Sequence, residues 1–216
     1  MSATVRYDQQ HCPIARALDV LGDRWTLLIL RELNIGDQRF TDLSTHLPGI
    51  APTLLTQRLR TMIEYGLVTT KELPPPAARS VYSVTQRGRE AVPVLRALIR
   101  FGFPLLEAPA DDVEVRPWTA VNAAVGAYYR PLVAQGIDER YLLHVDGEHF
   151  TMSSVLGGGE AHDVADLELT ASARTWMDVR AGRVTLPDAI RSGAIVKRGS
   201  SRALANFRKI FQLTGE

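Results

Sequence analysis

The feature that most constrains the fold is one amphipathic segment, residues 52–65, followed directly by a proline-rich hairpin. Its apolar side chains repeat at the three- and four-residue spacing of one helix face, and these are Leu55, Leu59, Met62 and Ile63. Pro52 suits the first turn of a helix, and Gly66 suits the position after its last turn. Two β-prone runs, residues 67–73 and 80–85, flank the prolines that come next. The sequence therefore predicts a helix that leads straight into a β-hairpin.

The opposite face of the predicted helix carries polar side chains with hydrogen-bonding tips: Thr53, Thr56, Gln57 and Arg60. Such a face can enter the major groove of DNA and reach the edges of the bases. Near the hairpin tip, Arg79 can lie along the DNA backbone or in the minor groove, where a narrow groove attracts arginine. A solvated face is the simpler interpretation of an isolated amphipathic helix. The hairpin directly after this helix favours DNA contact.

Helical patterning also precedes and follows the helix and hairpin. Apolar residues share a helix face in residues 14–21 and again in residues 25–33, and residues 37–47 predict a short third helix. After the hairpin, residues 86–101 predict a closing helix in which Pro93 introduces a kink. Helices, a hairpin and a closing helix in this order are the elements of a winged helix.

Charge is distributed unevenly along the 216 residues, although the formal net charge is only +1. Residues 1–105 contain 13 Lys and Arg against 9 Asp and Glu, a net of +4. Residues 106–216 contain 12 against 15, a net of −3. A basic half joined to an acidic half suggests that only the first half meets a polyanion such as DNA.

Several classes of protein are excluded by what the sequence lacks. No apolar run approaches the roughly 18 residues that cross a bilayer, and the N-terminus lacks the apolar core of a signal peptide. We therefore expect a cytoplasmic protein without a membrane partner. The single cysteine, Cys12, excludes an internal disulfide framework, and the five histidines show no metal-ligand spacing. With no recognisable nucleophile motif either, we expect no metal, no cofactor, no catalytic residues and no enzymatic activity.

A stretch rich in proline and acidic residues predicts a linker over residues 106–117, between a domain 1–105 and a domain 118–216. The pattern of the second domain predicts helix 118–132, strands 140–145 and 148–155 joined by an Asp146-Gly147 turn, strand 166–170, helices 171–180 and 186–191, strand 194–197 and helix 201–213. Strands with helices over one face form an α+β layer, so we predict the α+β fold class.

A series of short motifs runs in order over residues 12–103. They are Cys12-Pro13-Ile14, Leu21-Gly22-Asp23-Arg24-Trp25-Thr26, Ile29-Leu30-Arg31-Glu32-Leu33, Arg39-Phe40, Leu47-Pro48-Gly49-Ile50, Leu55-Thr56-Gln57-Arg58-Leu59-Arg60, Gly66-Leu67-Val68, and Tyr82-Ser83-Val84-Thr85 before Gly88. These motifs resemble the HxlR-type family of bacterial regulators, a branch of the MarR-like winged helices. The resemblance implies a transcriptional regulator, expected to be a repressor, that binds a pseudo-palindromic double-stranded DNA operator as a homodimer. It adds Arg39 to the candidate DNA contacts Thr53, Thr56, Gln57, Arg60 and Arg79.

The sequence departs from the pattern of that family at three positions. The family usually has a serine where Ala51 stands, a basic residue near Thr53, and a tryptophan where Phe101 stands. Without a capping side chain, the recognition helix loses about 1 kcal/mol of stability. Fewer basic contacts should soften the salt dependence of DNA binding.

Cys12 has two interpretations. Some members of the family use a cysteine at the start of this Cys-Pro motif to sense oxidants or electrophiles, which requires an exposed and activated thiol. The alternative is a small apolar side chain packed at the dimer contact, the commoner state of an unpaired cysteine.

The end of the chain shows a second resemblance. Residues 182–190, 192–199 and 203–211 resemble the C-terminal part of sterol carrier protein domains, with an aliphatic strand, a pair of small residues and a final apolar helix. The resemblance implies an apolar cavity for a lipid-like ligand, without catalytic residues. The candidate lining residues are Trp118, Tyr128, Phe150, Met152, Trp176, Phe207 and Phe211. The domain is interpreted either as a sensor of a small apolar effector or as a scaffold that helps the chain dimerise.

Two functions from different classes follow from these observations. The first is a DNA-binding regulator controlled by a small apolar ligand or by oxidation of Cys12. The second is a lipid-binding carrier whose N-terminal domain serves mainly for dimerisation. The polar outer face of residues 52–65 and Arg79 favour the regulator, because a dimerisation module needs neither.

Overall fold

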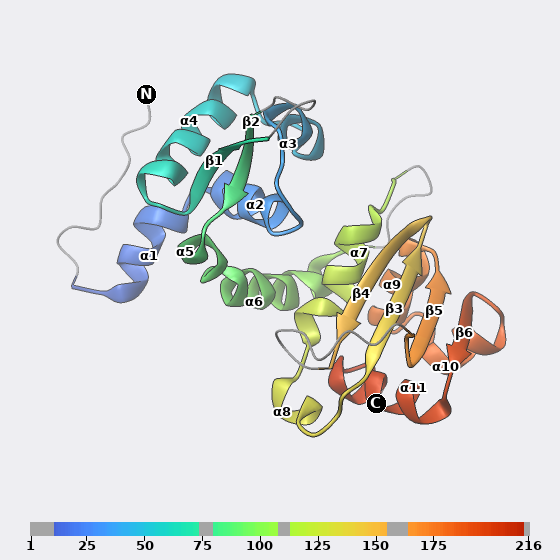
Figure 1. Ribbon diagram of the computed structural model, residues 1–216. Helices are drawn as coiled ribbons and strands as arrows, with labels where there is room; N and C mark the ends of the chain where they lie inside the picture. Colours follow the sequence, from blue (N-terminus) through green and yellow to red (C-terminus); the bar gives the residue numbers. More distant parts are fainter. Residues whose placement is uncertain (1–10, 74–79, 108–112, 155–163, 214–216) are drawn as a thin grey trace. The chain divides into compact units, whose positions relative to one another are not determined.

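The chain divides into two compact units, residues 1–95 and residues 96–216. The computed structural model describes residues 11–73, 80–107, 113–154 and 164–213 (Figure 1). Each unit contains its own cluster of buried apolar side chains. The predicted linker, residues 106–117, lies in the second unit and is described only in part.

The first unit is helical with one β-hairpin, in the predicted order. Its elements are α1 (Pro13–Leu21), α2 (Arg24–Leu33), α3 (Phe40–His46), α4 (Pro52–Glu64), β1 (Val68–Glu72), β2 (Ser80–Val84), α5 (Gln86–Arg89) and the start of α6 (Val92–Gly102). Strands β1 and β2 pair antiparallel, with Val68 opposite Val84 and Glu72 opposite Ser80. Helices α2, α3 and α4 bury their apolar faces together, which confirms the helical periodicity of residues 25–33 and 52–65.

The end of α4 and the hairpin are joined by backbone contacts that only certain residues allow. Gly66 follows α4 with φ of +69°, a left-handed conformation that favours glycine. The Thr85 hydroxyl donates to the Gly66 carbonyl at 2.6 Å and accepts from the Gly88 amide at 3.1 Å, so Thr85 also caps α5. A side chain at Gly88 would clash with the Leu67 carbonyl, which explains the glycine at this position.

The single closing helix predicted over residues 86–101 is wrong in detail. The structure has a short α5, which ends at Arg89, and a separate α6, which begins at Val92. Pro93 is the cause, because its ring has no N–H to donate to Arg89 and would clash with that carbonyl in a continuous helix. The predicted kink is a complete break.

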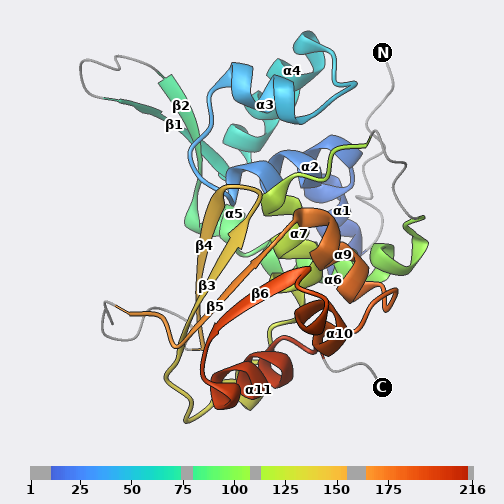
Figure 2. The same ribbon diagram turned by 90° about the vertical axis from the view of Figure 1, so that its right-hand side faces the viewer.

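The second unit is a four-stranded sheet with helices, as the α+β interpretation predicted. Its remaining elements are η1 (Phe103–Leu105), α7 (Pro117–Ala124), η2 (Gly126–Tyr128), α8 (Pro131–Ala134), β3 (Arg140–Val145), β4 (Glu148–Ser153), β5 (Leu167–Ala171), α9 (Ala173–Arg180), α10 (Leu186–Arg191), β6 (Ile195–Gly199) and α11 (Ser201–Ile210). The strand order is β4-β3-β5-β6, with β3 parallel to β5 and the outer pairs antiparallel. Figure 2 shows α7, α9 and α10 on one side of this sheet.

The turn between β3 and β4 confirms the predicted Asp-Gly hairpin. Asp146 and Gly147 both have positive φ, +46° and +87°, as a two-residue type I′ turn requires. The Asp146 carboxylate also accepts a hydrogen bond from the Ala173 amide at 2.8 Å. Because Ala173 is the first residue of α9, this bond fastens the hairpin turn to the helix that follows β5.

The predicted helix 118–132 is confirmed only as far as Ala124, because the chain leaves helical geometry at Val125. Helix α7 ends at Ala124, and residues 126–128 and 131–134 form separate short helical turns. Pro131 cannot continue a helix, and fully buried Val125 lies in the core of the unit. Tertiary packing of this segment therefore overrides its helical periodicity.

Aromatic rings form the centre of the second unit. The Phe207 ring lies 4.8 Å from Phe211, 5.1 Å from Tyr141 and 6.3 Å from Trp176 between centroids. These tilted and edge-on arrangements are the preferred geometry of packed aromatic side chains. The four rings come from β3, α9 and α11 with its final turn, so they join the sheet to its covering helices.

Arg180 binds the ends of two helices in this unit. Its guanidinium donates to the carbonyl of Ala124 at 2.6 Å and to those of Phe211 and Gln212, each at 2.8 Å. It also lies 3.7 Å from the centroid of the Tyr128 ring. Helices α7 and α11 thus receive donors for the carbonyls at or just beyond their C-terminal ends.

We expect Arg180→Ala to destabilise the second unit by about 3 kcal/mol, because it leaves these carbonyls without a charged donor. Urea unfolding of the full chain, followed by tryptophan fluorescence, measures the change. The control is Arg183→Ala, which removes an exposed arginine paired with Asp178 at 2.7 Å. An Arg180 variant as stable as the Arg183 variant contradicts the assigned role.

Candidate nucleic-acid interface

Helix α4 presents the predicted polar face to solvent. Leu55, Leu59 and Met62 are buried against the core of the first unit. The four residues of the polar face are all exposed, namely Thr53, Thr56, Gln57 and Arg60. Ile63 was wrongly placed in the buried stripe: its side chain is 40% exposed. One residue beyond Met62, it is rotated by about 100° around the helix, away from the core.

Within this face the side chains differ in the hydrogen bonds they can still make. The Thr56 hydroxyl donates to the Pro52 carbonyl at 2.9 Å, which leaves its oxygen and its methyl group for a ligand. Gln57 and Arg60 carry the amide and guanidinium groups that pair in two-bond fashion with adenine and guanine in the major groove. Gln57 and Arg60 are therefore the two side chains of this face whose chemistry suits a two-bond contact with a base.

Arg58 has a different task from its neighbour Arg60. Its guanidinium lies 2.7 Å from the Asp23 carboxylate, and both side chains are about three-quarters buried. Asp23 is also the N-cap of α2, where it accepts from the Trp25 amide at 2.9 Å. The sequence contains both residues within the family motifs, but only the structure shows that they fasten α4 to α2.

A buried carboxylate lies between α2 and α3. Glu32 is fully buried; its carboxylate accepts from the Arg31 guanidinium at 2.8 Å and lies 3.5 Å from the His46 imidazole. His46 ends α3, so this carboxylate connects the two helices before the recognition helix. A buried carboxylate requires such partners, because an unpaired one would carry a large desolvation cost.

The segment before α3 is attached to the hairpin by its backbone. Gln38 and Tyr82 exchange two hydrogen bonds, at 2.7 and 3.0 Å, so Gln38 forms an isolated bridge on the edge of β2 opposite β1. Arg39 is half-buried, and its backbone amide donates to the Asp42 carboxylate at 3.0 Å. The predicted DNA contact Arg39 therefore lies at the start of α3, directly after this bridge.

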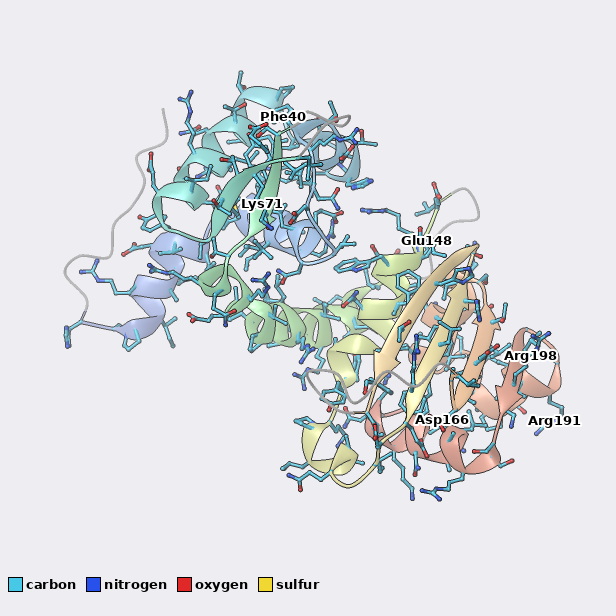
Figure 3. The ribbon with its side chains drawn as sticks, viewed as in Figure 1. Phe40, Lys71, Glu148, Asp166, Arg191 and Arg198 are labelled. Atoms are coloured by element: carbon cyan, nitrogen blue, oxygen red, sulfur yellow. The ribbon has the colours of Figure 1, made fainter. Side chains whose placement is uncertain are left out.

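Lys71 of β1 joins the hairpin to the same segment (Figure 3). Its ammonium group lies 3.2 Å from the Asp37 carboxylate. A hydrogen bond from Ser83 is the largest cause that lowers the pKa of Asp37, and Lys71 lowers it further. Because the pKa of Asp37 is lowered in the folded state, its ionised carboxylate stabilises the fold at neutral pH. This stabilisation is lost as the pH falls below about 4. The other predicted hairpin contact, Arg79, lies outside the described residues.

The candidate residues for redox sensing and for effector binding differ in how far they are buried. Cys12 is partly exposed at the N-cap of α1. Three of the proposed pocket residues are fully buried, namely Trp176, Phe207 and Phe211, and they pack in the aromatic core. The other four are half-buried, namely Trp118, Tyr128, Phe150 and Met152.

Comparison with known proteins identifies the first half of the chain. A sequence profile of the HxlR-like helix-turn-helix family matches residues 20–108. An HTH-type transcriptional regulator of Synechocystis is 41% identical over 96 residues, which are 44% of this chain and 71% of that protein. A regulator of the same description in Mycobacterium tuberculosis is 38% identical, over 44% of this chain and 60% of its own length. In the crystal structure of the transcription factor candidate PA1607, 35% of the aligned residues are identical. That alignment covers 52% of this chain and 77% of PA1607, with a TM-score of 0.45.

The chain therefore belongs to the HxlR-like helix-turn-helix family. Within the described residues, no helix is long and apolar enough to cross a membrane. In the same part of the chain, no group of three or more His, Cys, Asp and Glu side chains is arranged to hold a metal ion.

We expect Arg58→Ala to lower the stability of the first unit by about 1 kcal/mol, because the pair with Asp23 is partly exposed and screened. Arg60→Ala is the matched control on the same helix, with an expected change within about 0.5 kcal/mol. Thermal unfolding followed by circular dichroism compares the two variants. Equal melting temperatures would mean that Arg58 does not hold α4 in place.

Proposed function

We propose that this protein is a DNA-binding transcriptional repressor without enzymatic activity, and that α4 reads the operator. The observation that carries the proposal is the exposed polar face of α4. The opposite side of this helix is packed against the core of the first unit. Three buried apolar side chains and the Asp23–Arg58 pair hold the helix in position. The family membership supports the same assignment, because the matched relatives are described as HTH-type transcriptional regulators.

The proposed repressor acts as a homodimer on a pseudo-palindromic operator. Helix α6 supports this, because none of its eleven residues is buried although one face is apolar. Val94, Leu98 and Phe101 lie on this face at helical spacing and are exposed, Phe101 to 75%. A second copy of the chain would cover them, since an exposed apolar face of this kind marks a protein contact. Two recognition helices would then reach successive half-sites of one operator.

Leu98→Glu should shift the dimer to monomer, because it places a charge in the middle of the proposed contact. Light scattering during size-exclusion chromatography measures the mass. Leu132→Glu is the control, since Leu132 is exposed on α8, outside the α6 face. A Leu98 variant with the mass of the unsubstituted protein would show that α6 is not the dimer contact.

The second unit is proposed to be a sterol-carrier-like module that takes a small apolar effector. Support comes from its four-stranded sheet with helices on one side. Trp118, Tyr128, Phe150 and Met152 are the candidate contacts nearest to solvent, because they are only half-buried. Any effector that changes operator affinity must itself bind with an affinity that depends on DNA, since such coupling is reciprocal.

The DNA-binding proposal is tested by gel shift against the DNA upstream of the gene for this protein. We expect Arg60→Ala to weaken binding by about 5- to 100-fold, the cost of losing one two-bond base contact. Gln57→Ala should weaken it to a similar degree, and Arg79→Ala should weaken it through the hairpin.

The control is Arg183→Ala, between α9 and α10, which removes the same charge from the second unit. It should leave the affinity for DNA unchanged. Unchanged binding in the Arg60 and Gln57 variants would remove these residues from the interface. Absence of DNA binding even at low salt would overturn the proposal and favour the lipid carrier.

A further inference from the structure

The second unit carries a pair of histidines that the proposed function does not use. His144 on β3 and His149 on β4 lie directly opposite each other in the antiparallel ladder. The buried residues of β3 are Tyr141, Leu143 and Val145, so His144 belongs to the alternate face. Glu148, labelled in Figure 3, marks the start of β4 one residue before His149.

The two imidazole rings are in direct contact. Their Nδ1 atoms lie 2.7 Å apart, and the rings meet nearly edge-on, with centroids at 4.7 Å and an angle of 83°. At this distance one nitrogen donates and the other accepts, so a single proton lies between two ring nitrogens. A metal ion can replace that proton, because each neutral imidazole can place its lone pair on Nδ1 and its hydrogen on Nε2.

A neighbouring carboxylate favours this tautomer of His144. The Nε2 atom of His144 lies 3.8 Å from the Glu168 carboxylate on the adjacent strand β5. The distance is too long for a hydrogen bond, but the negative charge attracts an N–H at Nε2. Carboxylates placed behind a histidine ligand act in the same way at known metal sites, where they fix the ring and its tautomer.

The backbone under the two rings is held in place. A two-residue turn joins the strands, and the Asp146 carboxylate in that turn accepts from the amide of Ala173 at the start of α9. β3 is also paired on its other side with β5. The Cα positions of the pair are therefore preorganised, and only the rings need to rotate to direct both lone pairs at one ion.

We propose that His144 and His149 form a labile binding site for Cu²⁺, and more weakly for Ni²⁺, completed by water. With metal–nitrogen bonds of about 2.0–2.1 Å, two ligands at a right angle are about 2.8–3.0 Å apart, and two tetrahedral ligands about 3.3–3.4 Å. The hydrogen-bonded spacing of 2.7 Å has to widen in either case, and it widens less for the right angle of tetragonal Cu²⁺ and Ni²⁺ than for the tetrahedron that Zn²⁺ prefers. The inference is independent of DNA binding.

The experiment uses the full chain with any affinity tag removed and with Cys12→Ser, so that the thiol neither reduces nor binds copper. Calorimetric titration at about pH 7.5 compares CuCl₂, NiCl₂ and ZnCl₂. We expect one Cu²⁺ per chain and the order Cu²⁺ over Ni²⁺ over Zn²⁺. His144→Thr and His149→Thr should each weaken Cu²⁺ by at least about tenfold.

The matched control is His11→Thr, because His11 is exposed and lies outside the sheet. It should leave the affinity unchanged. Electron paramagnetic resonance adds a direct readout, since each sheet variant should remove one coupled nitrogen from the Cu²⁺ signal. Unchanged copper affinity in both sheet variants would overturn the site, and tighter binding of Zn²⁺ than of Ni²⁺ would overturn the right-angle geometry.

Discussion

The ion pair between Asp23 and Arg58 is the contact on which the interface of the first unit depends. Asp23 caps α2 and, with the same carboxylate, holds the arginine of α4 at 2.7 Å. One side chain thus fixes both the start of the central helix and the orientation of the recognition helix. Burial of Leu55, Leu59 and Met62 supplies most of the adhesion, but an apolar stripe alone allows a helix to slide or rotate. The Asp23–Arg58 pair restricts this sliding and rotation, and so fixes the orientation of the outer face of α4.

Arg180 plays a comparable part in the second unit, by a different chemistry. Within the part of the chain that the structure describes, its hydrogen bonds go to three backbone carbonyls and not to a carboxylate. Burial lowers its pKa to about 10, so the guanidinium remains charged at neutral pH. Here the charge is stabilised by the exposed dipoles at helix ends rather than by an opposite ion. Each unit therefore has one arginine whose contacts join helices from different parts of the chain.

Much of the interface was predictable from the sequence, because periodicity and capping residues act locally. The polar face of α4, the hairpin after it and the Asp146-Gly147 turn follow from spacing and from residues that adopt positive φ. Errors arose where distant contacts compete with local pattern. Residues 118–132 have helical periodicity, yet Val125 is drawn into the core and the helix breaks. Ile63 shows a different kind of error, because consecutive helix residues point in directions about 100° apart. Met62 is buried, whereas the next residue, Ile63, is exposed.

The sequence by itself determined the order of the elements, the family motifs and the residues available on the outer face of α4. Those properties depend on side chains a few positions apart, whose geometry a helix or a strand fixes in advance. Only the tertiary structure showed that Arg58 pairs with Asp23 at the start of α2, whereas Arg60 is exposed as its place on the outer face predicted. It likewise decided that His144 and His149 meet at 2.7 Å. The predicted two-residue turn at Asp146-Gly147 already places the two residues opposite each other, and the structure adds the direct contact between their rings.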